Sequence, residues 1–144
     1  MRWFTLTELI RSETATRKGI ENMPTAEQEH NLDALIKNVL DPLREVFGSP
    51  IQVTSGYRGP ALNKAVGGAK NSHHCRGMAA DIIARNGDNA RMFDISRRML
   101  PFTQLIWEKG NDTQPAWVHI SYDPEDLRHE ILKTRDGKNY TRIV

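Results

Sequence analysis

The clearest hydrophobic pattern in the chain lies between residues 24 and 50. Apolar residues recur there every three or four positions, which is the period of a helix with one buried face. Thr25 followed three residues later by Gln28 is typical of a helix N-terminus, and Gly48 and Pro50 mark its end. We expect Pro42 to bend the last turns or to separate them from the rest. The apolar positions, which predict a core-facing stripe, are Leu32, Leu35, Ile36, Val39, Leu40, Leu43 and Phe47.

Shorter patterns predict the remaining elements. Residues 4–12 and 88–101 have helical periods, while residues 59–72 begin as a short helix that ends at Gly67 and Gly68. Four segments rich in β-branched and aromatic residues predict strands, and they are residues 51–58, 78–85, 103–108 and 116–122. Residues 17–25 are typical of a loop, and the charged segment from Asp123 onward has no pattern that we assign. In the second amphipathic helix, the side chains expected to face the core are Met92, Phe93, Ile95 and Met99.

This alternation of elements predicts one α+β domain over residues 1–144, with helices packed on a small, mostly antiparallel sheet. The net charge of +2 is spread along the chain without a long basic run, so it does not favour a nucleic-acid partner. No apolar run is long enough to span a bilayer, and the first residues lack the apolar core of a secretory signal. We therefore expect a monomer that is made in the cytoplasm. The single cysteine, Cys75, excludes an internal disulfide framework.

Three residues on separate elements are candidate metal ligands. His74 and Asp81 flank a stretch of small residues, and Asp81 interrupts an otherwise apolar strand, where a carboxylate is costly unless it is paired or bound to a metal. His119 lies on the strand 116–122, where alternation places it with Trp117 and Ser121 on one face. A catalytic zinc needs three such protein ligands and an open position for water. The alternatives are that Asp81 caps a loop or pairs with an arginine, and that His119 is a structural histidine.

Other polar residues are candidates for catalysis and substrate binding. If the two late strands form a hairpin, Glu108 lies near the pairing partner of Trp117 and diagonal to His119, at a distance that suits a general base. Asp112 in the following loop is a weaker rival, and either carboxylate has a surface role as its alternative. Arg58 is suited to bind a carboxylate or to stabilise an oxyanion, and Ser72 to anchor its loop or a substrate.

Taken in order, these residues form a motif set. The chain has Ser55-Gly56-Tyr57-Arg58, then "SHHCRGMAAD" over residues 72–81, then Trp117-Val118-His119. The set resembles the zinc peptidases of the D-Ala-D-Ala carboxypeptidase type, which include L-alanyl-D-glutamate endopeptidases of phages and bacteria. The resemblance covers roughly residues 51–121 and implies the fold that these enzymes share with the Hedgehog signalling domain.

The resemblance also implies roles for individual residues. The family ligand two positions after the serine is His74, so the ligands of one zinc ion would be His74, Asp81 and His119. His73 then occupies a variable position, either at the rim or in contact with the ligands, and Cys75 is interpreted as a packing residue. Many relatives carry an acid three residues before the last histidine, where this chain has Ala116. Glu108 is the expected replacement.

The function implied by the resemblance is hydrolysis of an amide bond in peptidoglycan stem peptides by a zinc-activated water. The bond would be either D-Ala-D-Ala or L-Ala-D-Glu. Glu108 and Arg58 are the expected catalytic residues, and Tyr57, Arg58 and Ser72 the expected substrate contacts. The protein would act on the cell wall after release or as part of a phage particle. The alternatives are an inactive zinc-containing relative that binds the wall, and a metal-free scaffold.

Overall fold

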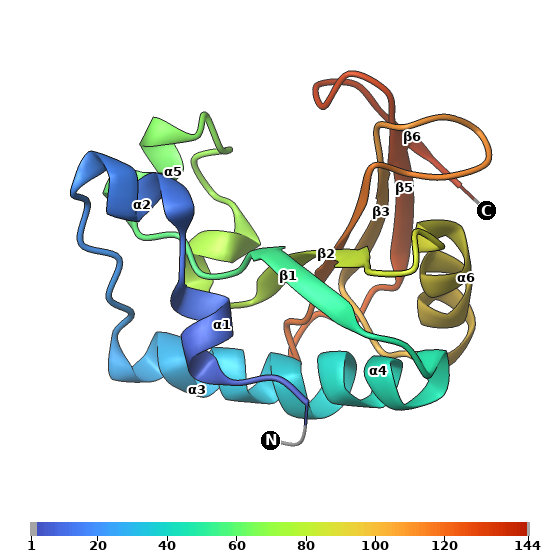
Figure 1. Ribbon diagram of the computed structural model, residues 1–144, viewed down its shortest axis with the longest axis horizontal. Helices are drawn as coiled ribbons and strands as arrows, with labels where there is room; N and C mark the ends of the chain where they lie inside the picture. Colours follow the sequence, from blue (N-terminus) through green and yellow to red (C-terminus); the bar gives the residue numbers. More distant parts are fainter. Residues whose placement is uncertain (1–2, 144) are drawn as a thin grey trace.

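The computed structural model describes residues 3–143, which form one six-stranded sheet with helices around it (Figure 1). The strand order is β1-β2-β4-β3-β5-β6. Neighbouring strands are antiparallel except β3 and β5, which are parallel, so the predicted α+β fold with a mostly antiparallel sheet is confirmed. The strands are β1 (Ile51–Ser55), β2 (Ala79–Ala84), β3 (Gln104–Glu108), β4 (Trp117–Ser121), β5 (Glu130–Thr134) and β6 (Tyr140–Arg142).

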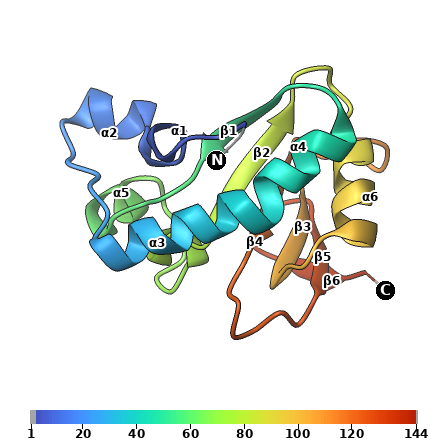
Figure 2. The same cartoon turned by 90° about the horizontal axis from the view of Figure 1, so that it is seen from below.

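A long helical segment crosses one face of the sheet (Figure 2). It consists of α3 (Ala26–Leu35), a π-helical turn η1 (Ile36–Leu40) and α4 (Asp41–Phe47). The Thr25 hydroxyl and the Gln28 side chain form the predicted capping box. Pro42 lies in the first turn of α4, where its missing N–H and its ring disfavour a regular α-helical bond to the preceding turn, and the helix widens there into η1. The irregularity that we expected at Pro42 is therefore present as a π-helical turn just before it.

The other helices are short, and two predictions about them were wrong. They are α1 (Leu6–Ile10), α2 (Glu13–Lys18), α5 (Pro60–Ala65), the 3-10 turn η2 (His73–Arg76) and α6 (Asn89–Met99). Arg17 and Lys18 belong to α2 instead of a loop, because the Ser12 hydroxyl accepts a hydrogen bond from the backbone N–H of Ala15 and caps this helix. Met99 is 58% exposed at the end of α6, whereas the other three apolar residues predicted on that helix are buried.

The two faces of the sheet have different chemistry. The face toward the helices carries the core, including Ala80 and Ile82 on β2 and Val118 and Ile120 on β4, all fully buried. Alternation turns Asp81 and His119 to the opposite face, where they pair in register across β2 and β4. The predicted register between β3 and β4 is confirmed, because Glu108 pairs with Trp117. The polar candidates of three strands therefore share one face.

The unassigned C-terminal segment supplies β5 and β6. Strand β5 pairs along all of β3, and the backbone N–H of Lys109 continues the contact with Thr134 at 2.7 Å. Figure 1 shows this part of the sheet rising on one side of the molecule, while α2 and α5 rise on the other side and β2 lies between them. No helix within residues 3–143 is long and apolar enough to cross a membrane.

Candidate metal centre

Three side chains from separate elements converge on the polar face of the sheet. His74 in η2, Asp81 in β2 and His119 in β4 each offer a ligand atom, and these atoms all lie within 4.8 Å of one another. The Oδ1 atom of Asp81 is 3.3 Å from Nε2 of His74 and 3.0 Å from Nδ1 of His119. The pairing of Asp81 with an arginine, considered from the sequence, is not observed among the described residues.

Local backbone contacts fix the orientation of His74. The Ser72 hydroxyl accepts a hydrogen bond from the backbone N–H of His74 at 3.1 Å and caps η2. On the imidazole ring, Nδ1 lies 2.7 Å from the carbonyl oxygen of Gly56. Because a carbonyl only accepts, Nδ1 carries a proton, and Nε2 is the ring nitrogen left to bind a ligand. This buried Nε2 atom forms no regular hydrogen bond in residues 3–143 and has only the Asp81 carboxylate nearby, at 3.3 Å, as expected of a metal-ligating nitrogen.

The distances from Asp81 to the two histidines fit ligands of a tetrahedral ion. Ligand atoms about 2.0–2.1 Å from zinc lie about 3.4 Å apart at tetrahedral angles, close to the 3.0 Å and 3.3 Å observed. Burial opposes ionisation of Asp81, but the adjacent imidazoles His74 and His119 outweigh it and hold the pKa of the carboxyl well below its usual range. Two imidazoles and an ionised carboxylate are a ligand set that zinc binds, and three protein ligands leave one position for water or substrate.

The three residues lie in a cleft of about 820 Å³, large enough for a drug-sized ligand or a short peptide. One wall comes from the segment around α5 and η2, including Gly68 and His73, and the other from β3, β4 and the C-terminal hairpin. Arg58 and Ser72 also line this space. Most of the residues selected from the sequence therefore meet in one cavity.

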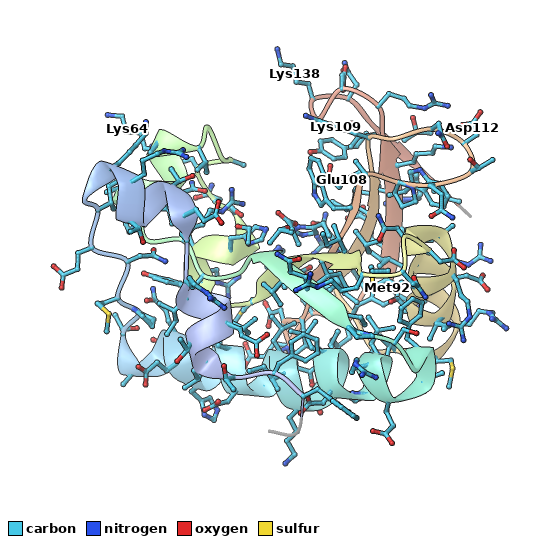
Figure 3. The ribbon with its side chains drawn as sticks, in the orientation of Figure 1. Lys64, Met92, Glu108, Lys109, Asp112 and Lys138 are labelled. Carbon is cyan, nitrogen blue, oxygen red and sulfur yellow. The ribbon has the colours of Figure 1, made fainter. Side chains whose placement is uncertain are left out.

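The structure separates the two carboxylates considered as a general base. Glu108 lines the cleft and is only 9% exposed, whereas Asp112 lies outside it on an exposed loop (Figure 3). Burial raises the pKa of Glu108, and the negative charge of Asp81 adds to this, while His119 lowers it. Asp112 instead pairs with Lys133 at 2.9 Å and with Arg135, and these contacts lower its pKa. Glu108 is thus the carboxylate that faces a ligand in the cleft.

Two of the expected substrate contacts have additional structural roles. The Ser72 hydroxyl lines the cleft but already caps η2. Tyr57 is buried in the core and lines a smaller hollow beside the cleft instead of the cleft itself. Arg58 donates its backbone N–H to the carbonyl of His74 at 3.1 Å, and its buried Nε has no partner within the described chain.

The neighbours of His74 differ in position. His73 lines the cleft, and burial, followed by the charge of His119, lowers its pKa. Cys75 is half-buried and is absent from the cleft lining, and its backbone carbonyl accepts a hydrogen bond from Gln28. Of the two neighbours, only His73 therefore lines the cleft.

Several cleft residues were not selected from the sequence. Lys109 follows Glu108 with a positive φ of 53°, and its Nζ lies 5.5 Å from the centre of the Trp117 indole ring. Leu132 and Tyr140 reach the cleft from β5 and β6. The only sequence signal for Lys109 is its position before a glycine in a hairpin loop. Leu132 and Tyr140 had none, because their strands lack an alternating pattern.

Comparison with known proteins bears on this arrangement of ligands and cleft. A family model described as Peptidase M15 matches residues 2–121, from the first helix to the end of β4. The matched region contains all three ligand candidates and Glu108, and it stops before the C-terminal hairpin. No curated protein matches the chain.

Proposed function

Because this chain belongs to the peptidase M15 family, we propose that it is a zinc-dependent peptidase that hydrolyses an amide bond in peptidoglycan stem peptides. The observation that carries the proposal is the convergence of His74, Asp81 and His119 in a cleft that is also lined by Glu108. These three residues would hold one zinc ion. When bound, zinc supplies Lewis acidity, which lowers the pKa of a coordinated water and polarises the substrate carbonyl.

Glu108 is proposed as the general base and acid. Its carboxylate takes one proton as the water oxygen bonds to the carbonyl carbon, and it returns that proton to the nitrogen as the C–N bond breaks. The products are a carboxylic acid and an amine, so the atoms of one water are consumed. The raised pKa of Glu108 supports this role, because a carboxyl with an elevated pKa is a stronger proton acceptor and is still able to give the proton back.

Arg58 is proposed to bind negative charge. Its guanidinium lines the cleft and forms no ion pair with the described carboxylates, while its Nε is buried and unpartnered. A buried donor without a partner is costly in the free protein, and a carboxylate or a developing oxyanion would satisfy it. Both candidate bonds, D-Ala-D-Ala and L-Ala-D-Glu, are followed by a residue with a free α-carboxylate.

The proposal is tested with zinc-loaded protein and defined stem peptides, with products identified by mass spectrometry. The wild type is expected to cleave one of the two bonds. Glu108→Gln should retain one zinc per chain and lose cleavage by about a hundredfold or more. Asp112→Asn is the matched control, since Asp112 lies outside the cleft, and it should retain activity. Unchanged cleavage by Glu108→Gln would remove Glu108 from the mechanism.

A second candidate function is supported by Ala116. This residue stands where many members of the family type carry their acid, three positions before His119. If Glu108 does not replace this acid, the protein would hold zinc and bind wall fragments without cleaving them. Turnover that a chelator abolishes and zinc restores would exclude this alternative, whereas stoichiometric zinc with fragment binding and no turnover would establish it.

A further inference from the structure

One wall of the large cleft carries apolar side chains that the hydrophobic core does not use. Ile106 on β3 and Leu132 on β5 both line the cleft. Their chain neighbours Leu105 and Ile131 belong to the core on the other face of the sheet, whereas Ile106 and Leu132 do not. Ile106 is buried and Leu132 is half-buried. Apolar side chains that line a cleft away from the core are typical of a ligand-binding surface.

Strand register joins these two residues to the candidate metal centre. Ile106 pairs with His119 across β3 and β4, and with Leu132 across β3 and β5. Because side chains in register share one face, the three form a row that starts at a candidate ligand. Neighbouring strands lie about 4.8 Å apart, so the row reaches Leu132 about 10 Å from His119. The apolar surface is thus continuous with the ligand group.

Tyr140 extends this surface from β6. It lines the cleft, and 47% of the residue is exposed. Its hydroxyl donates a hydrogen bond to the carbonyl of Gly137 at 3.2 Å, so the polar end of the side chain already has a partner. Burial raises the pKa of this hydroxyl, and the negative charge of Glu108 adds to the rise, so the side chain stays neutral. The name apolar strip is used below for Ile106, Leu132 and the ring of Tyr140.

The polar side chains beside the apolar strip are paired with one another. The carboxylate of Glu130 accepts hydrogen bonds from Gln104 at 2.7 Å and from Arg142 at 3.0 Å. Arg128 forms an ion pair with the same carboxylate at 3.4 Å. Gln104 and Arg128 both line the cleft. Since these groups already have partners, the feature of this wall that is left for a ligand to cover is the apolar strip.

Contacts at the turn between β5 and β6 hold the apolar strip in place. The backbone N–H of Lys109 donates to the carbonyl of Thr134 at 2.7 Å. A Cβ atom added at Gly137 would lie 3.2 Å from Cε of Lys109, so the turn packs directly against the loop that follows β3. Within the turn, the Asp136 carboxylate accepts two backbone hydrogen bonds at 2.8 Å. The wall is therefore formed before a ligand binds, which lowers the entropic cost of binding.

We propose that the apolar strip is the subsite for the residue two positions before the scissile bond, where it selects an aliphatic side chain. The inference rests on the proposed peptidase function and specifies its substrate class. With Arg58 on the carboxylate that follows the scissile bond, the preceding residues of an extended substrate lie against the opposite wall. An extended chain advances about 3.3–3.6 Å per residue, so two residues span about 7 Å from the ligand group, which ends between Ile106 and Leu132.

The family match supports a property of this chain's own C-terminal segment. Leu132 and Tyr140 lie beyond residue 121, where the match ends. Two of the three members of the apolar strip therefore come from the C-terminal hairpin, β5 and β6. The selected side chain is expected to be determined by this hairpin, whereas the ligand group lies wholly within the matched region.

Matched peptides test the apolar strip. Acetyl-norleucyl-D-Ala-D-Ala is compared with acetyl-glycyl-D-Ala-D-Ala, and the same pair is made with L-Ala-D-Glu as the cleaved bond. For the bond that is cleaved, norleucine should raise kcat/KM about ten- to fiftyfold over glycine, mainly through KM, since about two or three methylene groups leave water. Leu132→Ala should remove most of this preference, and Leu132→Met should keep it. Leu127→Ala, at a partly exposed leucine outside the cleft, is the control and should change neither peptide.

Two variants of Tyr140 separate the ring from the hydroxyl. Tyr140→Phe keeps the apolar ring and should retain the preference for norleucine. Tyr140→Ala should lower that preference about two- to fivefold and leave the glycine peptide unchanged. If Tyr140→Phe abolishes the preference, the hydroxyl selects the substrate instead of the apolar strip, and the proposal is overturned.

Equilibrium binding separates failure of the subsite from failure of the proposed function. Zinc-loaded Glu108→Gln protein is titrated with the same four peptides, and binding is followed by NMR. A preference for norleucine that disappears with Leu132→Ala supports the subsite even if no peptide is cleaved. The proposal is overturned if the norleucine and glycine peptides bind equally or not at all, or if Leu132→Ala weakens both equally. Absence of cleavage by the wild type with the binding preference intact would instead count against the peptidase function alone.

Discussion

Asp81 and His119 face each other in register across β2 and β4, with 3.0 Å between the carboxylate Oδ1 and the imidazole Nδ1. His74 reaches the same oxygen from η2, outside the sheet. Two ligands are thus set by strand pairing and the third by a capped turn. This combination makes the ligand group rigid before any ion binds, which favours tight binding.

Replacing Asp81 should weaken zinc binding without unfolding the sheet. Asp81→Asn keeps the shape of the side chain but removes the negative charge that both imidazoles contact. Since altering residues that merely support a ligand costs about ten- to hundredfold in affinity, loss of a ligand charge should cost at least that much. Competition with a chromophoric chelator measures the affinity. Asp112→Asn is the control, and equal affinities for the two variants would contradict the assigned ligand set.

The metal-free protein should become more stable when Glu108 is replaced by glutamine. Burial raises the pKa of Glu108 above its ordinary 4.5, so the stability contributed by its neutral form is present below 4.5 and lost as pH rises through the folded-state pKa. Glutamine does not ionise, so the variant does not lose this stability as the pH rises. At neutral pH the variant should therefore be more stable than the wild type, and below pH 4 the difference should vanish. Urea denaturation across this pH range provides the measurement, and a less stable variant at neutral pH would contradict the burial of an ionised carboxylate.

Gly56→Ala should disturb both the fold and the metal centre. The added methyl group would overlap the Leu9 carbonyl. In addition, the carbonyl oxygen of Gly56 is the atom that orients the His74 ring. We expect a loss of about 1–3 kcal/mol in unfolding free energy together with weaker zinc binding. Gly48→Ala is the control because Gly48 has a φ of 76° but no neighbour within 4 Å. It should lose stability and keep its zinc affinity, so a similar affinity loss in both variants would contradict the role of Gly56.

Asp136→Ala should loosen the turn between β5 and β6. The Asp136 carboxylate accepts hydrogen bonds from the backbone N–H groups of Lys138 and Asn139, both at 2.8 Å, and these bonds hold its pKa well below its usual range. Its stabilising effect is therefore present above pH 3.8 and lost as pH falls through the folded-state pKa. Thermal unfolding should show a lower Tm for the variant at pH 6 and a smaller difference in acid. Glu125→Ala, an exposed control, should show no such pH dependence.

Much of the fold was predictable because its signals are local. The apolar stripe of the long helix, the Thr25 capping box and the alternation in β4 each depend on neighbouring residues. The register of Glu108 with Trp117 also followed, since a polar loop between two neighbouring strands favours a hairpin. The start of α2 was missed because Ser12 precedes no apolar period. Strands β5 and β6 were missed because pairing with β3 selects them, and their charged sequences carry no period.

Some residues of the candidate site could also be predicted from local signals, whereas others could not. His74, Asp81 and His119 stood out because polar groups interrupt apolar or small-residue segments, and the motif set ordered them. Leu132 could not be selected, since its place in the cleft depends on the pairing of β5 with β3. Tyr57 was expected at the substrate but lies mainly in the core, because the pattern of its strand does not indicate where the strand ends.

The pairing of β5 with β3 has a consequence for the solution behaviour of the protein. Without residues 122–143, β3 would be an open edge whose backbone N–H and C=O groups could recruit a strand from another molecule. Chains shortened at residue 121, where the family match ends, should therefore self-associate through this edge even if their ligand residues remain in place. We therefore expect the C-terminal hairpin, which also forms a wall of the cleft, to limit self-association at β3.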